Sequence, residues 1–119
     1  IRQGNFTRTI RQRRFRMVVK TVIWTDTAVR ERRKILKYWT IRNKSATYSK
    51  KLILEIFERI QFLLKNPESF IKTNYNDIRT STLGHYNIYY EITKKELIVV
   101  AFWDNRQNPK SLLKILKTS

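Results

Sequence analysis

One apolar segment near the C-terminus, ELIVVAFW at 96–103, most restricts the folds open to this chain. Successive residues of a strand point to opposite faces of the sheet, so a strand with one exposed face alternates apolar and polar residues. This segment is apolar at both sets of positions. We therefore expect a central strand in a sheet.

Three other segments have strand character. MVVKTVIW at 17–24 is rich in β-branched residues, and DIRTSTL at 77–83 is short and polar. YNIYYEIT at 86–93 alternates, and Lys94-Lys95 then supplies a tight turn into 96–103. The alternation places Tyr86, Ile88, Tyr90 and Ile92 on one face of that strand, and Asn87, Tyr89 and Glu91 on the other.

The region between the first two strands has a helical period instead. Thr25 and Asp26 offer a helix cap, and the first helix should extend to about Ile41 with a basic outer face. A second helix should run to Lys65, where Asn66-Pro67 ends it, with Ser45 or Thr47 as its cap. The polar connection at 42–47 is short, which predicts an antiparallel pair of helices.

The predicted order of elements is therefore β-α-α-β-β-β, followed by a short C-terminal helix after Pro109. This order is typical of an α+β fold in which a helix hairpin packs on an antiparallel sheet. We assign residues 17–119 to one domain. Residues 1–16 contain six Arg, no acid and no periodicity, and we interpret them as a basic N-terminal arm.

Charge indicates the kind of partner. Lys and Arg number 26 against nine Asp and Glu, giving a net charge of +17, and such a surface attracts nucleic-acid phosphates or acidic proteins. The chain has no Cys, one His and no long apolar run. We therefore expect no metal, no cofactor and no membrane partner, and a cytoplasmic location.

Several motifs, taken in order, resemble the RelE/ParE superfamily of toxins from bacterial type II toxin–antitoxin pairs. The resemblance covers about residues 17–117 and rests also on the order of elements, the size and the basic charge. Ser69 stands where a Gly is common in the family. The motifs are KYWTIRNKSATYSKKL (37–52), KNPESF (65–70), DIR (77–79), LGHYNIYYEI (83–92) and FWDNRQNPKSL (102–112).

This resemblance implies a function and a partner. A small cognate antitoxin would lay a helix or strand across the apolar and basic surface and form a hetero-oligomer. In the ParE-like branch the toxin inhibits growth, and serves plasmid stabilisation, by binding a target such as DNA gyrase. One alternative is a RelE-like endoribonuclease that cuts mRNA on the ribosome, and another is a non-toxic basic module that binds nucleic acid.

The resemblance also indicates candidate site residues. Arg106 falls where the RNA-cleaving members carry a catalytic Arg, which would stabilise charge on a scissile phosphate. Arg79 lies near the position at which RelE-like members place a basic residue for RNA. Each has a structural alternative: Arg106 can pair with Asp104 or stack on Trp103, and Arg79 can form an internal salt bridge. Asp104 and Asn105 can equally cap the turn.

Departures from the ribonuclease pattern favour the ParE-like reading. Asn87 stands where RelE-like ribonucleases carry another Arg, and no Tyr or His follows Arg106. RNA cleavage needs a base, an acid and a charge stabiliser, and only the stabiliser is plainly present. His85 is either a turn residue or a general acid, and Tyr89 is the candidate functional tyrosine because it shares a face with Asn87.

Overall fold

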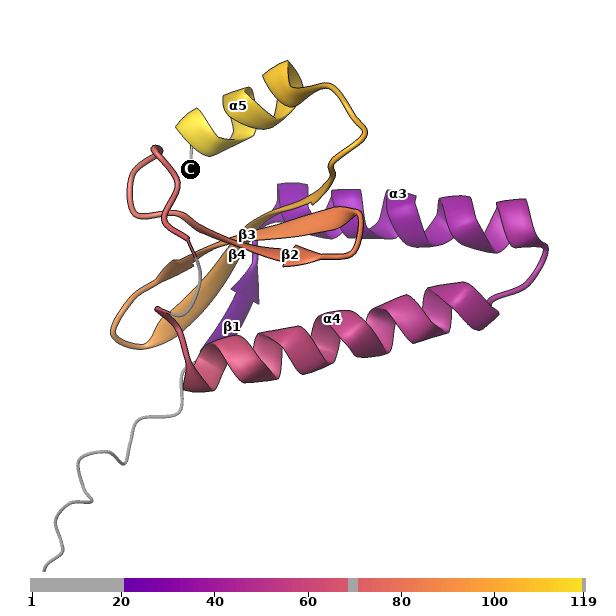
Figure 1. Cartoon of the computed structure of the whole chain (residues 1–119), viewed down its shortest axis with the longest axis horizontal. Helices are drawn as coiled ribbons and strands as arrows, with labels where there is room; N and C mark the ends of the chain where they lie inside the picture. Colours follow the sequence, from indigo (N-terminus) through magenta and orange to yellow (C-terminus); the bar gives the residue numbers. More distant parts are fainter. Residues whose placement is uncertain (1–20, 69–70, 119) are drawn as a thin grey trace, which may run out of the picture.

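A computed structural model describes residues 21–68 and 71–118 (Figure 1). It confirms the α+β order and the C-terminal helix. The predicted arm at 1–16 and the start of the strand predicted at 17–24 lie outside the described residues. The elements are β1 (Thr21–Trp24), α3 (Asp26–Asn43), α4 (Thr47–Lys65), β2 (Arg79–Leu83), β3 (Tyr86–Ile92), β4 (Glu96–Asp104) and α5 (Pro109–Lys117).

The four strands form one sheet in the order β1-β4-β3-β2, so β4 is central as predicted. β2, β3 and β4 are antiparallel, whereas β1 pairs with β4 in parallel. The sheet is therefore mixed rather than wholly antiparallel. Tight turns impose antiparallel pairing on consecutive strands, but β1 reaches β4 only after both helices and two other strands, so no hairpin constrains its direction.

The helix ends follow local chemistry. The Thr25 side chain accepts a hydrogen bond from the backbone N–H of Ala28 and caps α3, as expected. The predicted cap of α4 is wrong: Ala46 occupies that position and makes no side-chain bond. Ser45 lies one residue too early, and its hydroxyl accepts instead from the Thr47 N–H at 3.2 Å.

The sheet lies between two layers, with the α3–α4 hairpin on one face and α5 on the other (Figure 1). This arrangement explains why 97–103 is apolar at every position: β4 has a core on each side. The hairpin-side core includes Ile35, Leu52, Ile56, Ile60, Leu63, Tyr86, Ile88, Tyr90, Leu97, Val99 and Phe102. The α5-side core includes Ile78, Tyr89, Val100, Ala101, Trp103 and Leu116, with Leu112 and Ile115 packed against it.

An irregularity in β4 precedes its polar end. Tyr89 pairs with Ala101 and Tyr90 pairs with Val99, so Val100 is an extra residue in the ladder. Val100 and Ala101 consequently both belong to the α5-side core, and Phe102 turns back to the hairpin side. Bulges of this kind redirect the side chains that follow them.

Candidate functional site

The end of β4 meets the β2–β3 turn and forms a polar corner of the sheet. Tyr86 pairs with Asp104 in the ladder, and the backbone N–H of Asn105 donates to the His85 carbonyl at 2.9 Å. Gly84 makes this turn possible because its φ of +61° suits a residue without a Cβ. We call His85, Asp104, Asn105 and Arg106 the Asp104 corner.

Arg106 folds back onto Asp104. Its Nε and Nη2 atoms donate to Oδ1 and Oδ2 of Asp104, each at 2.9 Å, and its backbone N–H also donates to Oδ1 at 2.9 Å. These bonds from Arg106 hold the pKa of Asp104 below its ordinary value. The structural alternative of an Arg106–Asp104 pair is therefore present, with the Asp104 side chain 15% exposed and that of Arg106 53% exposed.

A chain of side-chain hydrogen bonds continues from this corner across the α5-side face of the sheet. Asn105 Nδ2 donates to Asn87 Oδ1, and Asn87 Nδ2 donates to the Tyr89 hydroxyl, each at 3.2 Å. Tyr89 lies on the predicted face with Asn87, but its ring is buried in the α5-side core. Tyr89 is therefore a core residue whose hydroxyl is the last group in this chain of hydrogen bonds.

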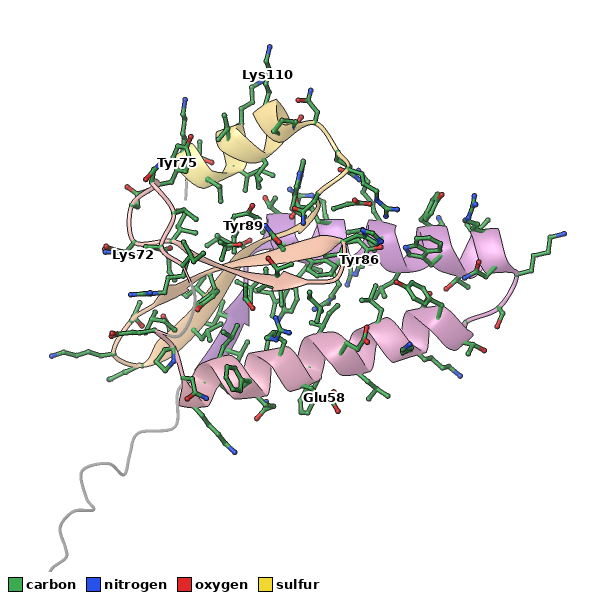
Figure 2. All side chains as sticks on the ribbon, viewed as in Figure 1. Glu58, Lys72, Tyr75, Tyr86, Tyr89 and Lys110 are labelled. Atoms are coloured by element: carbon green, nitrogen blue, oxygen red, sulfur yellow. The ribbon has the colours of Figure 1, made fainter. Side chains whose placement is uncertain are left out.

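On the hairpin side of the corner, a pocket of about 470 Å³ opens beside α3. The indole N–H of Trp39 donates to the Tyr86 hydroxyl at 2.6 Å, and burial raises the pKa of Tyr86 above its ordinary value. Figure 2 shows Tyr86 at the end of the sheet beside α3. We call this the aromatic pocket, lined by Lys34, Ile35, Lys37, Tyr38, Trp39, Ile41, Tyr86, Asp104, Arg106 and Gln107.

Sequence reasoning did not assign the α3 side of this pocket. Tyr38 and Trp39 contact each other edge to face, with ring centroids 5.1 Å apart, and Lys34 and Lys37 border the same space. The sequence feature that could have indicated this pocket was KYW at 37–39, which places aromatic residues in a helix with an apolar face. Nothing local indicated that this turn of helix would face β3 and the end of β4.

Arg79 lies elsewhere. It pairs with Tyr90 on β3, four residues along β2 from the Leu83–Tyr86 pair, which is about 13 Å. An isolated bridge also joins Arg79 to Lys72, and Figure 2 shows Lys72 at the opposite side of the sheet from Tyr86. Seven predicted site residues thus gather at or near the Asp104 corner, and Arg79 does not join them.

The described residues limit the chemistry available. No group of three or more His, Asp or Glu within 21–68 and 71–118 is arranged to hold a metal ion. In the same ranges, no helix has both the length and the apolar character needed to cross a bilayer. What the aromatic pocket offers is two lysines and a guanidinium paired with Asp104, beside exposed and half-buried aromatic rings, a combination suited to binding an anionic or amphipathic partner.

Comparison with known proteins defines the class. Residues 22–109 match the family described as the ParE toxin of the type II toxin-antitoxin system, parDE. This match spans most of the chain, and the protein belongs to the ParE toxin family.

A solved structure described as the "Chromosomal ParDE TA system from P. aeruginosa" shares the fold. It aligns with a TM-score of 0.60 and 17% sequence identity, over 71% of this chain and 94% of that one. A search of curated proteins gave no match.

Proposed function

We propose that this ParE-family toxin arrests bacterial growth in the cytoplasm by binding a target enzyme such as DNA gyrase, and that a cognate antitoxin restrains it in a hetero-oligomer. The support comes from the family and from one feature of the site. The cation that RNA cleavage would use, Arg106, is already bonded to both oxygens of Asp104. A guanidinium that is already paired with a carboxylate is poorly placed to stabilise the negative charge that develops on a phosphate during cleavage.

The titratable groups of the aromatic pocket also favour binding over cleavage. Arg106 lowers the pKa of Asp104, and burial raises the pKa of Tyr86, so both pKa values lie further from neutral pH than the ordinary values of these groups. General acids and bases work best when their pKa lies near the working pH. The remaining candidate, His85, is exposed in the β2–β3 turn and does not line the pocket.

The separation of Arg79 from Arg106 supports the same conclusion. A ribonuclease built on both arginines would bring them to one phosphate. Arg79 lies at one end of the β2–β3 ladder, whereas Arg106 follows the end of β4 that pairs with the other end of β3. Arg79 lies instead near Tyr90, where its charge partly offsets the effect of burial in raising the pKa of that tyrosine.

We assign the antitoxin to a different surface, the groove between the two long helices. This hairpin groove has a volume of about 380 Å³ and is lined by Arg32, Arg33, Leu36, Ile53, Ile56 and Phe57. Beside it, Ile53, Leu54 and Phe57 are exposed by 47%, 63% and 59%. Apolar side chains beside the two arginines of α3 suit an amphipathic helix with acidic residues next to its apolar face.

The decisive experiment separates target binding from RNA cleavage. The full chain is induced in a bacterial host, and purified protein is added to a gyrase supercoiling reaction. We expect growth arrest, loss of supercoiling and intact transcripts. Arg106→Ala should reduce toxicity only as far as it disturbs the corner, and Lys95→Ala, in an exposed turn remote from the pocket, is the matched control.

Two results would overturn the proposal. Transcripts cut at codons on translating ribosomes, with the cuts abolished by Arg106→Ala, would assign the RelE-like activity. Normal growth with folded protein and unaffected gyrase would remove the toxic function and leave the nucleic-acid-binding module.

A further inference from the structure

The solvent face of α3 carries a row of cations. Arg30, Arg33, Lys34 and Lys37 follow the i, i+3, i+4, i+7 spacing, and all four are exposed. At a rise of 1.5 Å per residue, the row extends about 10 Å along the helix. We call these four residues the α3 strip.

Acidic residues of α3 offset the strip only in part, through the electrostatic attraction between Glu31 and the strip residues Arg30 and Lys34. The helix contains two, and Asp26 lies in its first turn. The other, Glu31, points inward, where its carboxylate accepts a hydrogen bond from the backbone N–H of Phe102 at 3.0 Å. The ion pairs found among the described residues join Lys72 to Asp77 and Arg106 to Asp104, and neither involves the strip.

The four strip residues are cations without an aromatic or aliphatic anchor among them, although Lys34 and Lys37 also line the aromatic pocket beside Tyr38. Protein–protein interfaces are anchored by aromatic and aliphatic side chains and are poor in Lys. The exposed large apolar residues of α3 are Tyr38 and Ile41, which follow the strip. Interfaces with nucleic acid are instead polar and strongly positive.

We infer that the α3 strip binds the phosphodiester backbone of nucleic acid without regard to sequence. Duplex DNA presents one phosphate per 3.4 Å of axis on each strand, so a row about 10 Å long can contact about three of them. This contact does not require gyrase as the target, but Lys34 and Lys37 also line the aromatic pocket, so a partner bound there would share these two charges. Arg33 also borders the hairpin groove, so an antitoxin helix seated there would compete with the backbone at that residue.

The test measures binding of the full chain to labelled duplex DNA, single-stranded DNA and RNA by fluorescence anisotropy, between about 50 and 200 mM salt. The strip variant carries Arg30→Ala, Lys34→Ala and Lys37→Ala, which leaves Arg33 and the hairpin groove intact. The control carries Lys50→Ala, Lys51→Ala and Lys95→Ala, exposed residues on α4 and in the β3–β4 turn. Both variants lose three positive charges from the same net charge of +17.

Each lost phosphate contact should lower the slope of log affinity against log salt by about 0.9 for duplex DNA. The strip variant should therefore lose about 2 to 3 in slope, with affinity at about 0.1 M salt reduced roughly 100-fold or more. The slope of log affinity against log salt should fall by less than about 1 for the control variant. Equal urea midpoints for the three proteins show that folding is unaffected, and the relative affinities for the three probes identify the nucleic acid preferred.

Three results would overturn the inference. The first is an equal slope for the strip variant and the control. The second is binding that disappears when the six arginines of residues 1–16 become Gln while the strip variant binds normally, which would assign the contact to that segment. The third is polyglutamate binding as tightly as DNA with the same dependence on the strip, which would make the partner an acidic polypeptide.

Discussion

The Glu31 carboxylate on α3 accepts a hydrogen bond from the backbone N–H of Phe102 on β4, across 71 residues of sequence and 3.0 Å of space. The bond lies where β1 has ended: Trp24 pairs with Val99, and the Thr25 N–H donates to the Val99 carbonyl. Beyond that point no strand within residues 21–68 and 71–118 pairs with β4 on this side, and the side chain of a helix replaces the missing ladder bond.

Replacing Glu31 with Ala should destabilise the fold by about 1–3 kcal/mol, because the buried Phe102 N–H loses its acceptor. Glu31→Gln should cost less, since its amide oxygen can still accept and no charge is buried. Burial raises the pKa of Glu31, which shows that its charge is disfavoured there. Urea unfolding checks both variants, and equal losses for Ala and Gln would show that the hydrogen bond contributes nothing.

The pairing of Asp104 with Arg106 should make stability depend on pH in the acid range. The folded-state pKa of Asp104 lies below 3.8, so its contribution is present above pH 3.8 and is lost as pH falls through the lowered value. The difference in Tm between the wild type and Asp104→Asn should accordingly shrink as pH falls below that point. A difference that stays constant down to the lowest pH at which both proteins fold would contradict the assignment.

Tyr86→Phe should destabilise the protein by about 1 kcal/mol, because the Trp39 indole N–H loses its partner while the packing of the ring is kept. The matched control is Tyr38→Phe, where a half-exposed ring loses a hydroxyl and the change should stay within about 0.5 kcal/mol. Chemical denaturation followed by tryptophan fluorescence measures both. Similar changes in the free energy of unfolding for the two variants would show that the Trp39–Tyr86 hydrogen bond does not stabilise the fold.

Gly84→Ala should cost about 1 kcal/mol through backbone strain alone. No atom lies within 4 Å of a Cβ placed there, but the φ of +61° is unfavourable for alanine. Asn tolerates this region better, so Gly84→Asn should cost less. Thermal unfolding of the two variants tests the order, and a variant with Ala as stable as the wild type would show that the turn relaxes to another conformation.

Much of the fold followed from local patterns. The alternation in 86–93 correctly separated Tyr89 from Tyr86, and the continuous apolar run in 96–103 correctly predicted a central strand. Asn66-Pro67 ended the second helix at Lys65 as expected. These features depend on the period of apolar residues and on the geometry of a few turn residues, both of which act within one element.

The site depended on contacts that no local pattern carries. Seven candidate residues came together because Tyr86 on β3 and Asp104 on β4 are ladder partners. Arg79, on β2, lies four residues along its strand from the Leu83–Tyr86 pair and stays apart from them.

The sequence by itself determined which segments are helices and strands and which of their faces are apolar, because those properties depend on neighbours a few residues apart. Only the tertiary structure decided that β1 runs parallel to β4, that Glu31 replaces a ladder bond, and that Trp39 meets Tyr86 to form the aromatic pocket. Each of these depends on the register between elements, which is set by how the two cores pack on β4.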